Sequence, residues 1–248
     1  MRGEKTLVSR DGPHAEEPRR EPGRLEARTP APLIHLKNAT AGYGGRAALR
    51  GIDLTIYAGE RVALMGRSGA GKSTLVNLIH RELGGQVALA PQASALVDAL
   101  SVFHNVYMGR LDRRSTLRNL WTLVRPAQAD VAAVRETLAL VELEAELFSK
   151  AGALSGGQRQ RVSVARALYD GRPVIVADEP VSALDRRQGA AILARIAERS
   201  ETTILVLHDA PLALDHVDRI VVLDDGRIVL DQPSRALSAA DLAPFFEA

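Results

Sequence analysis

The chain has 248 residues, of which 46% are hydrophobic and 25% charged, with a formal net charge of +2. This is the composition of a globular protein with enough apolar side chains for one large domain or two small ones. The absence of cysteine excludes disulfides and thiolate metal sites, and no apolar run reaches the roughly 18 to 20 residues needed to span a bilayer.

Acidic and basic residues are mixed along most of the chain, so the sequence shows no stripe suited to nucleic acid and we expect no nucleic-acid partner. Residues 1–31 are rich in Arg, Glu, Pro and Gly and are predicted to be a disordered tail. A solvated extension or a misplaced start codon is the simplest interpretation of this tail, and binding to an anionic surface is the alternative. The remaining residues, 32–248, are expected to form the folded domain.

The first folded region is expected to be mostly antiparallel sheet. Residues 33–36 form a short apolar run, and residues 48–56 alternate apolar and polar side chains as a half-buried strand does. Between them, Tyr43 lies in a glycine-rich loop over residues 41–45. An aromatic face there could stack on an adenine ring, or Tyr43 could be an ordinary packing residue.

The most informative stretch is residues 66–74, which fit the phosphate-loop pattern G-x-x-x-x-G-K-[ST] between an apolar strand and a helix. Its glycines allow consecutive N–H groups to converge on an anion, and the following helix presents its positive end to the phosphates. We expect the lysine to reach the β- and γ-phosphates and the serine to bind Mg²⁺. A glycine-rich turn without a ligand is the alternative. The residues are Gly66, Arg67, Ser68, Gly69, Ala70, Gly71, Lys72, Ser73 and Thr74.

A helical region is predicted after a short strand that ends near Gln92, which could reach Mg²⁺ or be a surface residue. Over residues 94–150 two apolar stripes recur at helical spacing, and an arginine-rich piece at 110–115 is either a docking surface or a solvated face. The stripes consist of Leu117, Leu120, Trp121 and Val124, and of Val131, Val134, Leu138 and Val141.

A second phosphate-binding surface is predicted at residues 154–158, where Ser155, Gly156, Gly157 and Gln158 open a helix. Unsatisfied N–H groups and the helix dipole favour an anion at such a start. Two phosphate surfaces in one subunit indicate a head-to-tail dimer in which each surface completes the other's site. A serine N-cap followed by a glycine turn is the alternative.

Carboxylates follow a buried strand at residues 173–177, a run whose β-branched side chains are typical of a central parallel strand. Asp178 is placed to hold Mg²⁺, and Glu179 to accept a proton from an attacking water. A turn at residues 182–185 follows, and the next strand ends at His208, which could hydrogen-bond a γ-phosphate or be structural. Further on, residues 219–230 are predicted to form a hairpin around Asp224, Asp225 and Gly226. Residues 234–248 are predicted to form a terminal helix or short helices.

Taken in order, these stretches resemble the ATP-binding cassette (ABC) ATPases over residues 33 to about 235. The likeness rests on residues 66–74 as Walker A, Gln92 as the Q-loop, 154–158 as the LSGGQ signature, 174–179 as Walker B, 182–185 as the D-loop and His208 as the switch histidine. Tyr43 matches the family's adenine-stacking residue.

The resemblance implies an α/β fold: a P-loop NTPase core with an antiparallel β edge subdomain and a helical signature subdomain over about 93–165. It also implies a head-to-tail dimer that closes on two ATP molecules, in which Lys72, Gln92, Glu179 and His208 serve catalysis and Asp185 lies near the nucleotide. Ser73, Gln92 and Asp178 would hold Mg²⁺. The implied partners are a transmembrane permease, a second copy of the chain and, indirectly, a solute-binding protein, at the cytoplasmic face of the inner membrane.

Within the family, residues 96–111 look most like phosphonate-importer ATPases, which makes phosphonate or a related phosphorus oxyanion the expected solute. One departure is that only 19 residues lie between Lys72 and Gln92, so part of the antiparallel subdomain is expected to be trimmed. The alternative function is a soluble ABC-type accessory ATPase of a carbon-phosphorus lyase complex without a permease.

Overall fold

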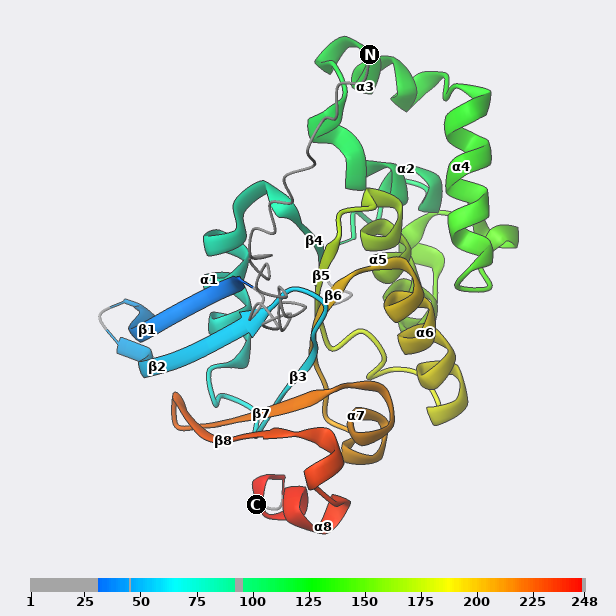
Figure 1. Cartoon of the computed structure of the whole chain (residues 1–248). Coiled ribbons are helices and arrows are strands. Elements are labelled where there is room, and N and C mark those ends of the chain that lie inside the picture. The colour runs from blue at the N-terminus through cyan, green and yellow to red at the C-terminus, as the bar shows by residue number, and fades with distance from the viewer. Residues whose placement is uncertain (1–30, 45, 92–95, 247–248) are drawn as a thin grey trace, which may run out of the picture.

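The computed structural model describes residues 31–44, 46–91 and 96–246, and it consists of two sheets with helices packed around them (Figure 1). A two-stranded antiparallel hairpin, β1-β2, lies beside a six-stranded sheet of order β4-β5-β6-β3-β7-β8. All neighbours in the larger sheet are parallel except β7 and β8. The predicted α/β class with an antiparallel edge is therefore confirmed.

The described strands are β1 (Pro32–Tyr43), β2 (Arg46–Tyr57), β3 (Arg61–Met65), β4 (Val87–Ala90), β5 (Val174–Asp178), β6 (Thr202–Val206), β7 (Arg219–Asp224) and β8 (Arg227–Pro233). The described α-helices are α1 (Lys72–Leu83), α2 (Val102–Tyr107), α3 (Thr116–Val124), α4 (Gln128–Ala139), α5 (Gly156–Asp170), α6 (Arg186–Arg199), α7 (Ala210–His216) and α8 (Ala239–Leu242).

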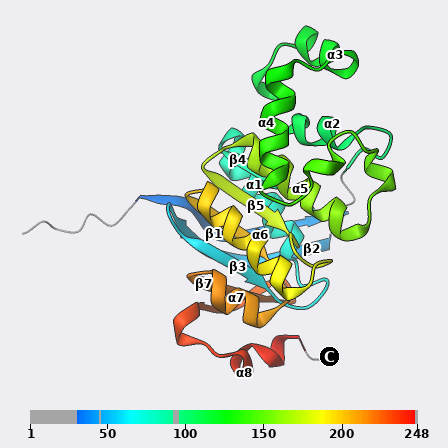
Figure 2. The same ribbon diagram turned by 90° about the vertical axis from the view of Figure 1, so that its right-hand side faces the viewer.

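The central strand β3 contributes to two cores because successive side chains of a strand point to opposite faces of the sheet. Val62 and Leu64 join the core that includes the hairpin and α1, whereas Ala63 and Met65 join the core formed with α5, α6 and α7. Figures 1 and 2 show this order, with α1 and the hairpin on one side of the sheet and α5 and α6 on the other. All four residues are fully buried, so β3 is fixed from both sides.

The carboxyl ends of β3, β5 and β6 meet at one edge of the sheet because the three strands are parallel neighbours. The loops that follow them begin after Met65, Asp178 and Val206. Ligands of open parallel sheets bind at such an edge. The fold thus brings together three loops that are far apart in the sequence.

The expected trimming between Lys72 and the Q-loop is visible in the described stretch 72–91. The stretch contains α1, a single 3₁₀ turn at Gly84–Gln86 and β4, and no antiparallel strand pair. β4, with four residues, forms the edge of the large sheet beside β5. Among the described strands, antiparallel pairing therefore occurs between β1 and β2 and between β7 and β8.

Two local predictions have different outcomes. The hairpin around Asp225 and Gly226 is confirmed, since both residues have positive φ, 39° and 74°, as a tight hairpin turn requires. The loop predicted at residues 41–45 is wrong in its extent, because β1 continues through Tyr43, which pairs with Arg46. Backbone pairing with β2 extends the strand beyond the short apolar run, and the sequence of that run alone does not indicate this pairing.

The two predicted apolar stripes of the helical region lie in different environments. Val134, Leu138 and Val141 are fully buried. The stripe on α3 is exposed instead: 81% of Leu117, 64% of Trp121 and 85% of Val124 are accessible, with Leu120 and Leu123 also exposed. Helical periodicity predicted an amphipathic helix, but no described element covers its apolar side.

Among the described residues, no helix is both long enough and apolar enough to cross a membrane.

Gly66 is the point at which the loop after β3 crosses the neighbouring strand β7. Its φ is 129°, and a Cβ there would lie 2.1 Å from the carbonyl oxygen of Leu223. Gly69, three residues later, also has a positive φ of 80°, but a Cβ there would meet no atom within 4 Å. Backbone packing therefore requires glycine at position 66, whereas position 69 requires only the left-handed conformation.

This pair gives a matched test of the loop's packing. We expect Gly66→Ala to lower the free energy of unfolding by roughly 3 kcal/mol or more, because backbone strain and a steric clash add. Gly69→Ala is expected to cost about 1 kcal/mol, from the strain alone. Urea unfolding of both variants measures the difference, and equal losses would contradict the proposed clash with Leu223.

The amino end of β3 is fixed by an ion pair between Arg61 and Asp218, which precedes β7. The Asp218 carboxylate accepts hydrogen bonds from the Arg61 backbone N–H at 3.1 Å and from its guanidinium Nε and Nη2 at 3.0 and 2.7 Å. The Arg61 side chain holds the pKa of Asp218 below its usual value. The ionised carboxylate is therefore the form that stabilises the fold.

Because the pKa of Asp218 is lowered by folding, its contribution is present above the unfolded value of about 3.9 and is lost as the pH falls through the folded value. We expect Asp218→Asn to cost about 0.5 to 1 kcal/mol at pH 7, since both side chains are nearly half exposed. The difference from the parent should shrink below about pH 4. Urea unfolding across pH checks this, with Glu198→Gln, in an exposed pair with Arg195, as control. A difference that grows on acidification would contradict it.

Candidate nucleotide site

The loop after β3 folds around the Lys72 ammonium group. Lys72 is 6% exposed, and its Nζ donates hydrogen bonds to the carbonyl oxygens of Gly66 at 2.7 Å and Arg67 at 2.8 Å. Burial lowers the pKa of Lys72, while the carboxylates of Glu179 and Asp178 oppose the shift. The lysine is thus a buried cation at the centre of the loop.

The amino end of α1 points into the same loop. Its N-cap is Gly71, with φ 104°, and no side chain caps the helix. Its first turn contains no acidic residue. The first N–H groups of a helix have no partners within the helix, and together with the dipole they favour an anion. The loop and helix therefore form a positive cradle.

A cavity of about 220 Å³ opens in front of this cradle. It combines side chains of the loop with two residues that follow β5 and β6, as the convergence of the strand ends requires. Its lining consists of Ala48, Ser68, Gly69, Gly71, Lys72, Ser73, Thr74, Glu179 and His208. Two other loop residues contact neighbouring segments instead. Ala70 is buried and its carbonyl accepts a hydrogen bond from Gly226 N–H, and the Arg67 side chain donates to the Pro244 carbonyl at 3.3 Å.

Asp178 and Ser73 face each other across the cradle. The Asp178 carboxylate is hydrogen-bonded to the Ser73 side chain, and burial raises the pKa of Asp178 despite this bond. A hydroxyl and a carboxylate are the hard oxygen donors that Mg²⁺ accepts, usually together with phosphate oxygens and water. Within the described part of the chain no cluster of three or more His, Asp or Glu side chains could hold a metal ion. The donor set therefore fits Mg²⁺ that arrives with a phosphate.

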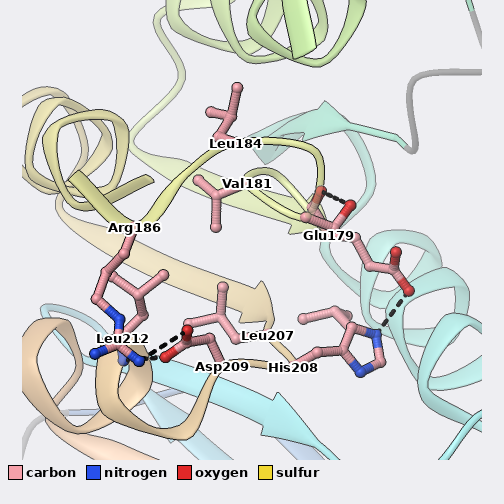
Figure 3. Close-up of a pocket in the computed structure, with 10 residues that line it drawn as sticks. Glu179, Val181, Leu184, Arg186, Leu207, His208, Asp209 and Leu212 are labelled. Atoms are coloured by element: carbon pink, nitrogen blue, oxygen red, sulfur yellow. Dashed lines mark hydrogen bonds and ion pairs between the residues drawn. The ribbon is translucent and has the colours of Figure 1, made fainter. Parts of the chain in front are cut away.

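Glu179 and His208 meet at the open side of the cavity. His208 Nε2 lies 2.7 Å from Glu179 Oε1. Figure 3 marks this contact between the two side chains with a dashed line. Glu179 directly follows β5 and has φ 53°, a left-handed conformation that a residue with a Cβ adopts only at a cost. A carboxylate in this strained position projects toward the phosphate cradle.

The start of α5 lies outside this cavity. The Ser155 side chain accepts a hydrogen bond from Gln158 N–H, and the Gln158 side chain accepts one from Ser155 N–H, which forms a capping box. Within one subunit the N-cap interpretation is therefore what the geometry shows. Neither Ser155, Gly156, Gly157 nor Gln158 lines the cavity.

The remaining predicted site residues are placed as follows. Asp185 is the N-cap of α6 and accepts a hydrogen bond from Gln188 N–H. Tyr43 is the last residue of β1, and its side chain lies outside what the structure describes. Gln92 also lies outside the described residues.

One residue of this region was not singled out from the sequence. Gln160, on the second turn of α5, is 3% exposed, and its amide contacts the segment that follows Glu179. A glutamine near a polar helix start resembles a surface residue. Its burial could have been predicted from its spacing of four and seven residues from the apolar Val164 and Ala167, which places Gln160 on the buried face of the helix.

Comparisons with known proteins agree with this geometry. The model of the ABC transporter family matches residues 49–182, more than half of the chain. The chain is 38% identical over 241 residues to the protein named phosphonates import ATP-binding protein PhnC of Thiobacillus denitrificans, covering 86% of this chain and 92% of that protein. A protein of the same name from Pseudomonas fluorescens is 40% identical over 235 residues, covering 83% and 88%.

A third relative of that name, from Anaeromyxobacter dehalogenans, is 36% identical over 88% of this chain, which spans about half of that protein's length.

Solved structures show the same fold. A dimeric bacterial ABC transporter cassette is 28% identical, with a TM-score of 0.70 over 82% of this chain and 99% of that one. A dimeric ATP-binding cassette in a post-hydrolysis state, bound to ADP and Pi, is 29% identical, with a TM-score of 0.67 over the same shares of the two chains. The family model, the relatives and the solved structures therefore agree, and the chain belongs to the ATP-binding ATPases of the ABC transporter family.

Proposed function

We propose that this chain is the ATP-hydrolysing subunit of an ABC importer for phosphonate or a related phosphorus oxyanion. The observation that carries the proposal is the convergence, in one cavity, of the buried Lys72 cation with the Glu179–His208 pair. A cation that neutralises phosphate charge and a carboxylate that orients water are the two parts that phosphoryl transfer to water requires.

The phosphates would lie on the loop of residues 66–74, against its N–H groups and the start of α1. Lys72 now donates to the Gly66 and Arg67 carbonyls, which lie within the same loop. It can therefore exchange these neutral acceptors for phosphate oxygens with little movement. Charged acceptors form stronger hydrogen bonds than carbonyls, which favours the exchange.

Ser73 and Asp178 are the described residues that would hold Mg²⁺, with Gln92 as a further proposed ligand. The ion would neutralise charge that develops on the phosphate oxygens. Asp178 remains close to Ser73 through their hydrogen bond, so the chain's two donors are already adjacent.

Glu179 would accept a proton from the water that attacks the γ-phosphorus, and His208 would contact the γ-phosphate. The hydrogen bond between His208 Nε2 and Glu179 Oε1 orients both groups. As the phosphorus–oxygen bond to ADP breaks, Lys72 stabilises the negative charge on the phosphates, so placement and electrostatics supply most of the rate.

A second copy of the chain would complete the site, because Ser155, Gly156, Gly157 and Gln158 do not line the cavity of their own subunit. In a head-to-tail dimer they would contact the partner's γ-phosphate, and Asp185 would lie near the interface. Two solved cassettes of this fold are dimers. Tyr43 would stack on the adenine.

A permease is the proposed membrane partner, with a solute-binding protein as its indirect partner, which would place the chain peripherally at the cytoplasmic face of the cell membrane. The exposed apolar side of α3, including Leu117, Trp121 and Val124, supports a protein partner for the helical region. The relatives named phosphonates import ATP-binding protein are the reason for choosing this solute class.

The base assignment has a direct test. We expect Glu179→Gln to lower ATP turnover by about 10²-fold or more, since an amide cannot accept the proton, while ATP binding is retained. Phosphate release and equilibrium ATP binding measure the two effects. Glu136→Gln, an exposed change on α4, is the matched control and should leave turnover at the parental rate. Parental turnover in Glu179→Gln would show that Glu179 is not the base.

Affinity purification of the full chain carrying Glu179→Gln, in the presence of ATP, tests the partner. We expect recovery of a polytopic membrane protein, and loss of this recovery when Leu117 and Trp121 on α3 are both changed to Ser. Recovery of a soluble carbon-phosphorus lyase complex without any membrane protein would reject the importer and favour the alternative of an accessory ATPase.

A further inference from the structure

Gln160 connects α5 to the backbone of the proposed catalytic segment. Its Nε2 donates hydrogen bonds to the carbonyl oxygen of Glu179 and to Ser182 Oγ, the latter at 2.8 Å. Its Oε1 accepts a hydrogen bond from Ala183 N–H at 2.8 Å. One buried amide therefore joins three successive parts of the loop that follows β5.

The same loop also packs on α5 through Gly157, which lies three residues before Gln160 and so on the same face of the helix. A Cβ at Gly157 would lie 3.1 Å from the Ala183 carbonyl oxygen and 3.1 Å from Leu184 Cδ2. The absence of a side chain at position 157 thus lets the loop pack closely against the helix. The hydrogen bonds of Gln160 attach the loop at the same place.

This attachment matters because the Glu179 backbone is strained. A residue other than glycine with φ 53° costs of the order of 1 to 3 kcal/mol, and it persists only where its surroundings hold it. The Glu179 carbonyl accepts from Gln160, and Ser182 Oγ lies 3.5 Å from the same oxygen. The Glu179 side chain is held separately, because its Oε1 lies 2.7 Å from His208 Nε2.

We propose that Gln160 is a positioning residue for ATP hydrolysis: its amide holds the left-handed backbone of Glu179 and thereby directs the carboxylate into the phosphate cavity. This inference rests on the proposed role of Glu179 as the base. Gln160 does not itself line the cavity, and its printed hydrogen bonds go to Glu179, Ser182 and Ala183, so it acts through the loop at 179–183.

The change that isolates this role is Gln160→Met, which keeps the length and the buried volume of the side chain but removes its hydrogen bonds. We expect the kcat for ATP to fall by about 10-fold or more, because small displacements of a catalytic group are costly, with KM within about twofold of the parent. Arg161→Met is the matched control: it removes two hydrogen bonds from the same helix, which go to the Val141 and Glu142 carbonyls and not to the loop at 179–183. It should retain the parental kcat.

A double-variant cycle separates positioning from a general loss of stability. If Gln160 acts through Glu179, adding Gln160→Met to Glu179→Gln should change the single-turnover rate by no more than about twofold, because the group being positioned is already absent. Thermal unfolding of every variant confirms that the comparison is made on folded protein. An equal loss in the parent and in the Glu179→Gln background would overturn the proposal.

Ser182→Ala keeps the test decisive if Gln160→Met does not fold, since Ser182 is exposed and its loss removes one partner of the same amide. A loss of about twofold to fivefold in kcat, absent in the Glu179→Gln background, is expected. If Gln160→Met does not fold, an unchanged kcat in Ser182→Ala overturns the proposal.

The outcomes also distinguish this inference from the proposed function. If Glu179→Gln turns over ATP at the parental rate, Glu179 is not the base, and the proposed role of Gln160 is rejected together with it. Loss of turnover in Glu179→Gln together with parental kcat in folded Gln160→Met overturns only the role of Gln160.

Discussion

The close approach of backbone to backbone at the end of β3 is the constraint on which the site depends. Gly66 lies against the carbonyl of Leu223 on β7, and Gly71 and Gly226 both pack against the carbonyl of Ala48. These close approaches to backbone carbonyls fix the loop relative to β2 and β7. The side chains of Lys72 and Ser73 line the cavity together with Glu179 and His208, and Ser73 is hydrogen-bonded to Asp178 at the end of β5.

Much of this arrangement could be predicted because it depends on local rules. The phosphate-loop pattern requires a strand before it and a helix after it, and β3 and α1 are found in those places. The buried run before Asp178 predicted a parallel strand, and β5 lies between two parallel neighbours. The Asp-Gly pair at 225–226 predicted the hairpin, because few residues other than glycine and Asp or Asn accept positive φ.

What the sequence could not reveal depends on contacts between distant segments. Periodicity indicated an apolar stripe on α3 but not that it would remain exposed, because a pattern says nothing about which element covers it. The extent of β1 through Tyr43 is set by pairing with β2. The contacts of Gln160 join residues about 20 positions apart, and the left-handed backbone of Glu179 has no signature in its residue type. Positions of this kind are where local propensity and global structure disagree.

At Glu179 the residue type that would best stabilise the backbone differs from the residue type that the reaction requires. Glycine or asparagine would adopt its φ of 53° more readily than glutamate does, yet neither supplies a carboxylate. A library selected for heat resistance alone would therefore be enriched in these residues at position 179. A library selected for ATP turnover would keep glutamate and would instead accumulate stabilising changes elsewhere in the chain, away from this strained turn.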